Sequence, residues 1–346
     1  MKDYLINYDK TALEYIITHG YNQPVFRAGQ INGWLYKGAE ICEMHNLPSA
    51  FRLALADKYE AFPLSYKFDL YEEKTDTRKF IFSTADGIFI ESVALNYDHG
   101  ICVCVSTQAG CRMGCAFCES GKGGLIRNLT PGEMLSQIIR ISKMLSRRIT
   151  NIVLMGSGEP LDNYDNVKEF ILRANSPDGL SISMRNITLS TCGIVSGIKR
   201  LIEDKIFVNL SLSLHAPSHE LRSKIMPVEK AYNINEAIQA CKQYRKESSR
   251  RITLEYCLIE GFNDTAECAK ALYQICKNTD MLINLIDVNS TKGKYTRNSV
   301  HCMRNFVEKL KSYNINYTIR RRLGSSINAA CGQLRSEYAA NQNGGA

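Results

Sequence analysis

Three cysteines, Cys111, Cys115 and Cys118, are the residues of this chain best suited by type and spacing to do chemistry. Thiolates are the usual ligands of iron–sulfur clusters, and a cubane of four irons held by three cysteines leaves one iron open to bind another molecule. Structural zinc is the alternative, but a zinc site is normally closed by a fourth ligand. No Cys or His follows within twenty residues of Cys118. The spacing therefore favours a 4Fe-4S cluster with an open coordination site.

The composition indicates a protein that meets a polyanion in a reducing compartment. The 346 residues can bury a sizeable core and are typical of about two domains. The 13 cysteines are odd in number and scattered, unlike a disulfide framework. The net charge of +8 favours a nucleic-acid partner, with a basic surface that only aids solubility as the alternative. Because the N-terminal residues lack a signal peptide and no stretch is long enough to cross a bilayer, we expect a cytoplasmic protein without a membrane partner.

Alternating strand-like and helical segments from residue 101 onward form the scaffold that must position the cysteines. Seven strand-like segments are separated by stretches long enough for helices, namely 101–106, 151–155, 186–190, 207–213, 252–258, 283–288 and 315–320. This order is typical of parallel β/α units. We expect an α/β protein built on a partial or full β/α barrel, with its chemistry at the carboxyl ends of the strands.

The residues before the barrel segments follow different patterns. Apolar residues recur at helical spacing over 26–36, whereas 79–82 and 88–90 alternate around a turn, which is typical of a β-hairpin. Within the barrel, Thr130 and Glu133 predict the capping box of a helix. The predicted organisation is an N-terminal helical accessory module, a β-hairpin linker region, the barrel core and a flexible tail, at residues 1–64, 65–98, 99–337 and 338–346.

Polar residues stand at the expected carboxyl ends of several strands. They are Glu159 after the second strand, Ser190 in the third, Ser213 and His215 in the fourth, and Asn289 after the sixth, with Gly158 and Leu214 next to them in the sequence. Taken singly, a polar residue at a strand end usually satisfies backbone groups of the loop. Because the strand ends of a barrel meet at one edge, we expect these residues to face the cysteines and favour a cofactor site.

Several motifs together resemble the RlmN/Cfr family of radical S-adenosylmethionine (SAM) RNA methyltransferases, over nearly the whole chain. The motifs lie at residues 108–118, 127–130, 158–160, 213–217, 225–227, 261–264 and 329–334. The resemblance implies a radical SAM partial β/α barrel with a 4Fe-4S cluster on the three cysteines. It also implies methylation of an aromatic adenine carbon in 23S rRNA at the peptidyl-transferase centre, and of a tRNA anticodon-loop adenine. Pro160 favours the RlmN branch, which methylates carbon 2, over the Cfr branch, which methylates carbon 8 and confers ribosomal antibiotic resistance.

The same resemblance assigns roles to individual residues. It implies that SAM is held by the strand-end residues Gly158, Glu159, Ser190, Ser213, Leu214, His215 and Asn289. One SAM methylates Cys331, and a second is cleaved to a 5′-deoxyadenosyl radical that takes a hydrogen from this methyl group. The methyl carbon then adds to adenine, Cys104 releases the protein–RNA adduct by forming a disulfide with Cys331, and Glu91 removes the adenine proton.

Glu91 also departs from the pattern of its own segment. Period two places Glu91 on the same face as Phe89 and Val93, so its carboxylate lies on an apolar face. Desolvation there would raise the pKa of Glu91 and make it a better proton acceptor near neutral pH. The alternative is a charge on an edge strand that prevents aggregation.

The expected partners are RNA and an electron donor. Basic pairs and triplets occur at 147–148, 245–246, 250–251 and 320–322, and about half of them would contact phosphates. The N-terminal module is expected to bind RNA, and the target adenine must leave its stack to reach a buried site. The resemblance implies a flavodoxin-type electron donor, and we expect a monomer. A non-catalytic RNA-binding protein with a structural metal is the alternative from another functional class.

Overall fold

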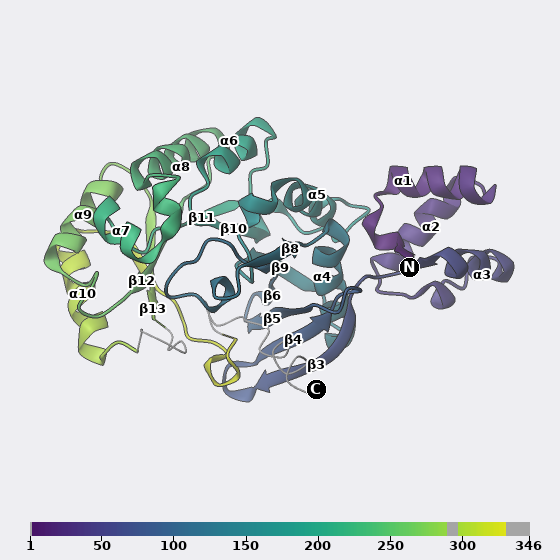
Figure 1. The fold of residues 1–346 in the computed structure, drawn as a ribbon, viewed down its shortest axis with the longest axis horizontal. Helices are drawn as coiled ribbons and strands as arrows, with labels where there is room; N and C mark the ends of the chain where they lie inside the picture. Colours follow the sequence, from purple (N-terminus) through teal and green to yellow (C-terminus); the bar gives the residue numbers. More distant parts are fainter. Residues whose placement is uncertain (1, 289–296, 330–346) are drawn as a thin grey trace.

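The fold is a large sheet curved within a layer of helices, with a small group of helices beside it (Figure 1). The structure is a computed structural model that describes residues 2–288 and 297–329. Asn289 and Cys331 lie outside the described residues. In the described part of the chain, no helix combines the length and the apolar character needed to span a membrane.

One ten-stranded sheet organises the molecule. Its strand order is β14-β13-β12-β11-β10-β9-β6-β5-β4-β3. The parallel strands are β6 (Gly100–Cys104), β9 (Ile149–Leu154), β10 (Ile187–Thr191), β11 (Asn209–Ser213), β12 (Thr253–Leu258), β13 (Leu282–Asp287) and β14 (Tyr317–Ile319). Each of the seven predicted barrel strands is present, with bounds shifted by at most three residues. Because β14 and β3 are the two edges among the described residues, the predicted partial barrel is confirmed.

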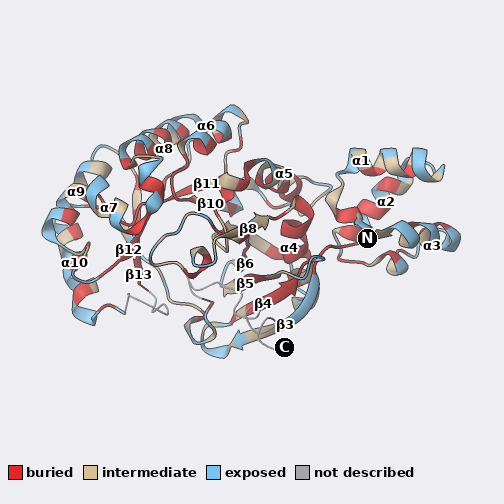
Figure 2. Ribbon diagram, viewed as in Figure 1, coloured by how far each residue is buried: buried red, intermediate tan, exposed pale blue. Residues whose placement is uncertain are grey.

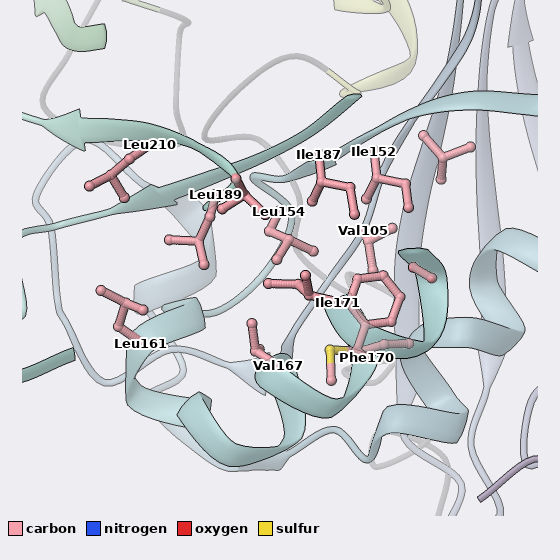
Figure 3. Packing of buried hydrophobic residues seen from close by; sticks show 14 of the residues in the cluster. Val105, Ile152, Leu154, Leu161, Val167, Phe170, Ile171, Ile187, Leu189 and Leu210 are labelled. Carbon is pink, nitrogen blue, oxygen red and sulfur yellow. The ribbon is translucent and has the colours of Figure 1, made fainter. Parts of the chain in front are cut away.

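Helices follow the parallel strands and cover the outer face of the sheet (Figure 1). They are α4 (Pro131–Leu145), α5 (Tyr164–Asn175), α6 (Val195–Glu203), α7 (His219–Ile225), α8 (Ile234–Ser248), α9 (Ala266–Cys276) and α10 (Val300–Ser312). Figure 2 shows buried residues concentrated in the strands and on the inner sides of these helices, with exposed residues on the outer sides. Figure 3 shows one such contact, in which Phe170 and Ile171 of α5 pack near Ile152 and Ile187 of the sheet.

The predicted hairpin extends the sheet. Strands β3 (Ser65–Glu72), β4 (Thr77–Ser83) and β5 (Phe89–Tyr97) are antiparallel, and β5 also pairs with β6. Strand β5 therefore lies inside the sheet, and the edge-strand alternative for Glu91 is wrong.

The N-terminal helices dock on the outer helices of the barrel (Figure 1). They comprise α1 (Lys10–Tyr15), a π-helix (Ile16–Gly20), α2 (Phe26–Leu35) and α3 (Ser49–Lys58), beside the short strand pair β1 (Asp3–Tyr4) and β2 (Tyr59–Glu60). Two long-range hydrogen bonds fix them: Arg173 Nη2 donates to the Ile6 carbonyl at 2.8 Å, and Asn32 Nδ2 donates to the Asp178 carbonyl at 2.6 Å. Their buried residues belong to the same hydrophobic cluster as the barrel.

The predicted capping box of α4 is confirmed and gives a stability prediction. Thr130 Oγ1 accepts from the Glu133 N–H at 3.1 Å, and Glu133 Oε2 accepts from the Thr130 N–H at 2.9 Å. We expect Thr130→Ala to lower the free energy of unfolding by about 1 kcal/mol, because it leaves a helix N–H without its acceptor. Thr11→Ala, an exposed helical position, is the control for chemical denaturation. Equal stability of the two variants would contradict the prediction.

Candidate active site

One cavity brings the three cysteines and the polar strand ends together. The sequence-predicted residues that line it are Cys111, Cys115, Cys118, Gly158, Glu159, Ser190, Ser213 and His215. Leu214 is fully buried directly behind this wall. Asn289 lies outside the described residues, so the structure leaves its place in the cavity untested.

A small β-clamp holds the cysteine loop at its base. Strand β7 (Gln108–Gly110) pairs antiparallel with β8 (Leu125–Asn128), and the Cys111 N–H donates to the Gly124 carbonyl at 2.9 Å. Gly110 has φ +77°, and a Cβ there would stand 2.1 Å from the Gly124 carbonyl oxygen. A larger residue at Gly110 would therefore open the clamp that presents the thiols to the cavity.

The three thiols fit a cubane better than a single ion. Burial raises the pKa of Cys111 to about 12 and also raises the pKa of Cys115, so a bound cation must replace their protons. Within the described residues, no three Cys, His, Asp or Glu side chains converge as ligands of one metal ion. In a 4Fe-4S cluster each cysteine binds a different iron, so convergence on a point is not required. Three soft donors on one loop, open on the cavity side, fit such a cluster.

The end of β9 offers backbone groups to the cavity. Gly158 has φ +108°, and a Cβ there would stand 2.7 Å from the Gln108 backbone nitrogen. The carboxylate of Glu159 accepts from the N–H groups of Leu161 at 3.1 Å and Cys192 at 2.7 Å. Burial raises the pKa of Glu159, while the bond from Cys192 opposes that rise. The Glu159 side chain thus ties the ends of β9 and β10 together, while its own N–H donates to Gln108 Oε1 at 2.9 Å.

Arg222 fixes the strand ends on the next side of the cavity. Its guanidinium donates to the carbonyls of Cys192 at 2.5 Å, Ser213 at 3.1 Å and Leu214 at 3.2 Å. It also forms a buried ion pair with Glu229, and the side chains are 1% and 0% exposed. The hydroxyls of Ser190 and Ser213 then face each other at 3.3 Å. Arg222 therefore holds two strand ends in register for a shared ligand.

His215 is held as a neutral imidazole. Its backbone has φ +54°, and its Nδ1 accepts from the Cys257 N–H at 3.0 Å. Burial, followed by the charge of Arg222, lowers the pKa of His215 to about 3. The proton therefore lies on Nε2, which is left as a donor. The ring also contacts Phe117 edge to face with centroids 4.6 Å apart, which links β11 to the cysteine loop.

A second group of residues gathers on one face of the sheet beside this cavity. Val93 of β5 pairs with Cys104 of β6, and period two places Glu91 on the same face. Glu91 is 3% exposed, and its Oε1 lies 3.6 Å from Lys79 Nζ. Cys104 and Val93 pack against Ala329, which precedes Cys331 by two residues. Cys331 itself lies outside the described residues.

The two groups meet at Met155. Its side chain lines the cavity and also packs against the cluster formed by Val93, Cys104 and Ala329. A molecule in the cavity therefore lies next to the face that carries Glu91 and Cys104.

Sequence reasoning missed Lys79, Arg222 and Glu255. Glu255 lines the cavity from β12, where burial raises its pKa. A charge inside the apolar run of β12 is the same signal that identified Glu91, and it applies to Lys79 on β4 as well. Arg222 lies on a helix with charged neighbours, so its burial has no sequence signal.

The basic triplet at 320–322 was expected among the phosphate contacts, and the structure places two of its members elsewhere. Arg320 lines the cavity with its Nη1 3.7 Å from Glu255, and Arg322 pairs with Asp287. Only Arg321 of the three is exposed. Two arginines of the triplet therefore have carboxylate partners within the barrel, and phosphate contacts of the triplet stay a prediction.

Removal of Arg222 is expected to cost far more stability than removal of a surface arginine. Arg222→Met leaves the Glu229 carboxylate buried without its partner, a change that costs about 3–5 kcal/mol. Arg200→Met is the matched control, because the Arg200–Asp165 pair is exposed and worth at most about 1 kcal/mol. Chemical denaturation of both variants measures the difference. Similar losses would contradict the role assigned to Arg222, and adding Glu229→Gln should restore part of the loss.

Protonation of His215 is expected to destabilise the fold in acid. Because the folded-state pKa is about 3 and the unfolded value about 6.5, the unfolded chain binds the extra proton first. The contribution of neutral His215 to the free energy of unfolding is complete above about pH 6.5. It decreases by about 1.4 kcal/mol per pH unit as the pH falls from there toward 3. In His215→Gln, the free energy of unfolding should depend less on pH in this window than in the wild type. The exposed control His99→Gln should keep the pH dependence of the wild type. Parallel curves for wild type and His215→Gln would contradict the prediction.

Comparisons with known proteins agree with this geometry. Residues 105–271 match the family model described as the radical SAM superfamily. The fold matches the crystal structure of a radical SAM methyltransferase from Sphaerobacter thermophilus with a TM-score of 0.93 at 38% identity, covering 97% of this chain and 100% of that one. Radical SAM proteins use a 4Fe-4S cluster and SAM, which agrees with the three cysteines in the cavity.

Curated relatives match over most of the chain. A protein of Lachnoclostridium phytofermentans is 47% identical over 317 residues, covering 90% of this chain and 89% of its own. One of Clostridioides difficile is 45% identical over 319 residues, covering 92% and 93%. Both carry the name "probable dual-specificity RNA methyltransferase RlmN". The expectation of an enzyme is thereby confirmed against the non-catalytic alternative, and the chain belongs to the RlmN family of radical SAM RNA methyltransferases.

Proposed function

We propose that this chain methylates carbon 2 of an adenine in 23S rRNA at the peptidyl-transferase centre and of an adenine in a tRNA anticodon loop. The relatives' shared name, with its dual specificity, supports two RNA substrates. The observation that carries the proposal is the single sheet face on which Glu91, Cys104 and Ala329 meet beside the cysteine-lined cavity. Pro160, which is typical of the RlmN branch, favours carbon 2 over carbon 8.

Carbon 2 of adenine is electron-poor and does not displace a methyl group from a sulfonium donor. When bound, the cluster and SAM supply the methyl group and the radical chemistry that this carbon requires. Cys111, Cys115 and Cys118 hold the cluster. The backbone of Gly158, Glu159 and Leu214 binds SAM together with the side chains of Ser190, Ser213, His215 and Asn289. Arg222 and the Glu159 carboxylate keep these strand ends in place.

Three residues act on the RNA. Cys331 carries the methyl group as a thioether and joins its carbon to adenine. Glu91 accepts the proton from carbon 2. Cys104, as a thiolate, attacks the sulfur of Cys331, so that a disulfide forms as the carbon–sulfur bond breaks. The electron pair of that bond stays with the bridging methylene carbon, which takes up a proton and becomes the methyl group. The burial of Glu91 and Cys104 supports these roles, because it keeps water from the reacting centre.

The RNA reaches this site with the adenine out of its stack. The N-terminal helices support RNA binding, since Arg27 lies over the exposed Phe26 ring and Lys37 over Trp34. A flavodoxin-type protein supplies electrons, and the enzyme acts as a monomer.

Anaerobic reconstitution followed by assay with SAM, reductant and unmodified 23S rRNA tests the proposal. Mass spectrometry of the digested RNA is expected to give an adenine methylated at carbon 2, and none with Cys331→Ala. A methyl group at carbon 8 would assign the protein to the Cfr branch. SAM cleavage without RNA methylation would overturn the substrate assignment while leaving the cofactor site intact.

Glu91→Gln tests the base. Loss of a positioned proton acceptor lowers the rate about a hundredfold to ten-thousandfold. Methylation of Cys331, which needs no adenine proton, should persist and can be followed by the mass of its peptide. Full RNA methylation by Glu91→Gln would contradict the assignment of Glu91.

A further inference from the structure

We propose that Lys79 is a positioning residue that keeps Glu91 in place as an anion and anchors the C-terminal segment, residues 324–329, which leads to Cys331. The inference rests on the proposed function, in which Glu91 is the base and Cys331 the methyl carrier. It adds a link between these two groups. Without such a link, the base and the methyl carrier would be set by separate parts of the fold.

Lys79 lies where a single ammonium group can contact both partners. It stands on β4 opposite Val93 of β5, so Glu91 is its diagonal neighbour on the same face of the sheet. Its Nζ lies 3.6 Å from Glu91 Oε1 and donates to the Asn328 carbonyl at 3.3 Å. The side chains of Lys79 and Glu91 are 5% and 3% exposed. Burying the ammonium group of Lys79 costs free energy unless it has partners. Glu91 and the Asn328 carbonyl are such partners, and both lie in the proposed site.

The C-terminal segment is anchored at its start by a second residue of the same hairpin. Glu72 of β3 accepts from the backbone N–H groups of Gly324 and Ser326, each at 2.9 Å. The Ala329 N–H then donates to the Gly324 carbonyl at 2.8 Å and closes the segment into a compact turn. Glu72 therefore fixes the beginning of the segment, and Lys79 fixes the end that precedes Cys331.

Packing gives the segment one orientation. Ala329 and Ile327 contact the apolar cluster that contains Val93 and Cys104. The bond from Lys79 to the Asn328 carbonyl lies between these two apolar contacts in the sequence. The segment is thus held on the face that carries Cys104.

Lys79 forms a buried ion pair with Glu91, and other titratable groups lie around this pair. Cys104 of β6, which pairs with Val93, lies on the same face of the sheet as Glu91, and the cysteine loop brings Glu119 to a second cavity that Glu91 also lines. Glu119 is itself paired with Lys122 at 2.6 Å. An ammonium beside a buried carboxylate favours the ionised form, whereas burial and a second carboxylate oppose it. Lys79, 3.6 Å from Glu91 Oε1, therefore opposes the protonation of the carboxylate.

The pH dependence of RNA methylation tests the first half of the proposal. We compare Lys79→Met with the charge-retaining control Lys79→Arg between pH 5.5 and 9, using the reconstituted enzyme. Lys79→Met should move the acid limb of the rate profile up by about one to three pH units. Its rate at pH 7 should fall below that of the wild type and recover as the pH rises. Lys79→Arg should keep the acid limb of the wild type.

Hydrogen exchange of peptides from 324–329 tests the second half and does not depend on activity. Exchange in this segment should accelerate in Lys79→Met, while peptides from α4 remain as in the wild type. If Lys79→Met fails to fold, the double variant Lys79→Met/Glu91→Gln removes both buried charges. This variant should fold and still exchange faster in the segment.

The outcomes separate the inference from the function on which it rests. If Glu91→Gln is inactive but Lys79→Met keeps the acid limb of the wild type, the role of Lys79 is overturned and the function stands. If Glu91→Gln methylates RNA at the full rate, the assignment of the base fails, whatever Lys79 does. Unchanged exchange at 324–329 in Lys79→Met, or in Lys79→Met/Glu91→Gln if the single variant does not fold, overturns the anchoring role.

Discussion

The pairing of β5 between β4 and β6 is the constraint on which the site depends. This register places Val93 opposite both Lys79 and Cys104, and Glu91 on the same face. Because side chains alternate along a strand, a slip of one residue would turn this set toward α4 and bring the apolar neighbours of Glu91 into the site. The parallel strands from β6 to β13 then end at one edge, where the cysteine loop closes the cavity. Under the proposed function, β4, β5 and β6 carry the residues that act on the RNA, and the ends of the parallel strands would hold the cofactor.

Buried charges in this protein mainly tie loops to strands. Glu159 joins the ends of β9 and β10 through two backbone N–H groups, and Arg222 joins β10 to β11 through three carbonyls. Buried Lys79, with half-buried Glu72, does the same for the C-terminal segment. Such groups add little net stability, since their desolvation offsets their attraction, but the loss of one partner is costly. Their value lies in fixing backbone groups that a cofactor or a reacting sulfur must meet within a fraction of an ångström.

Local patterns predicted the scaffold well because strand periodicity and capping are local properties. The seven barrel strands, the hairpin and the Thr130 cap were all found from the sequence. The cysteine spacing led to the cofactor site, whereas the role of Glu91 came from the family resemblance, with its out-of-pattern charge as added support. Contacts between distant segments were missed: Arg222 and Lys79 gain their roles only through partners that the fold brings to them. The contact of Arg320 with Glu255 was missed for the same reason, because a basic triplet carries no signal of the carboxylate that it meets inside the barrel. The edge-strand alternative for Glu91 failed because the alternation of residues along one strand does not reveal where that strand lies in the sheet.

The proposed chemistry requires Cys331 to reach Cys104, against which Ala329 packs. Mild oxidation of the apo-protein with diamide, followed by proteolysis and mass spectrometry of the disulfide-linked peptides, tests it most directly. The account predicts a dominant Cys104–Cys331 pair, with Cys102, two residues earlier on β6, left unpaired to Cys331 as an internal control. Pairing of Cys331 mainly with another cysteine, or no pairing of Cys331 while other disulfides form, would contradict it.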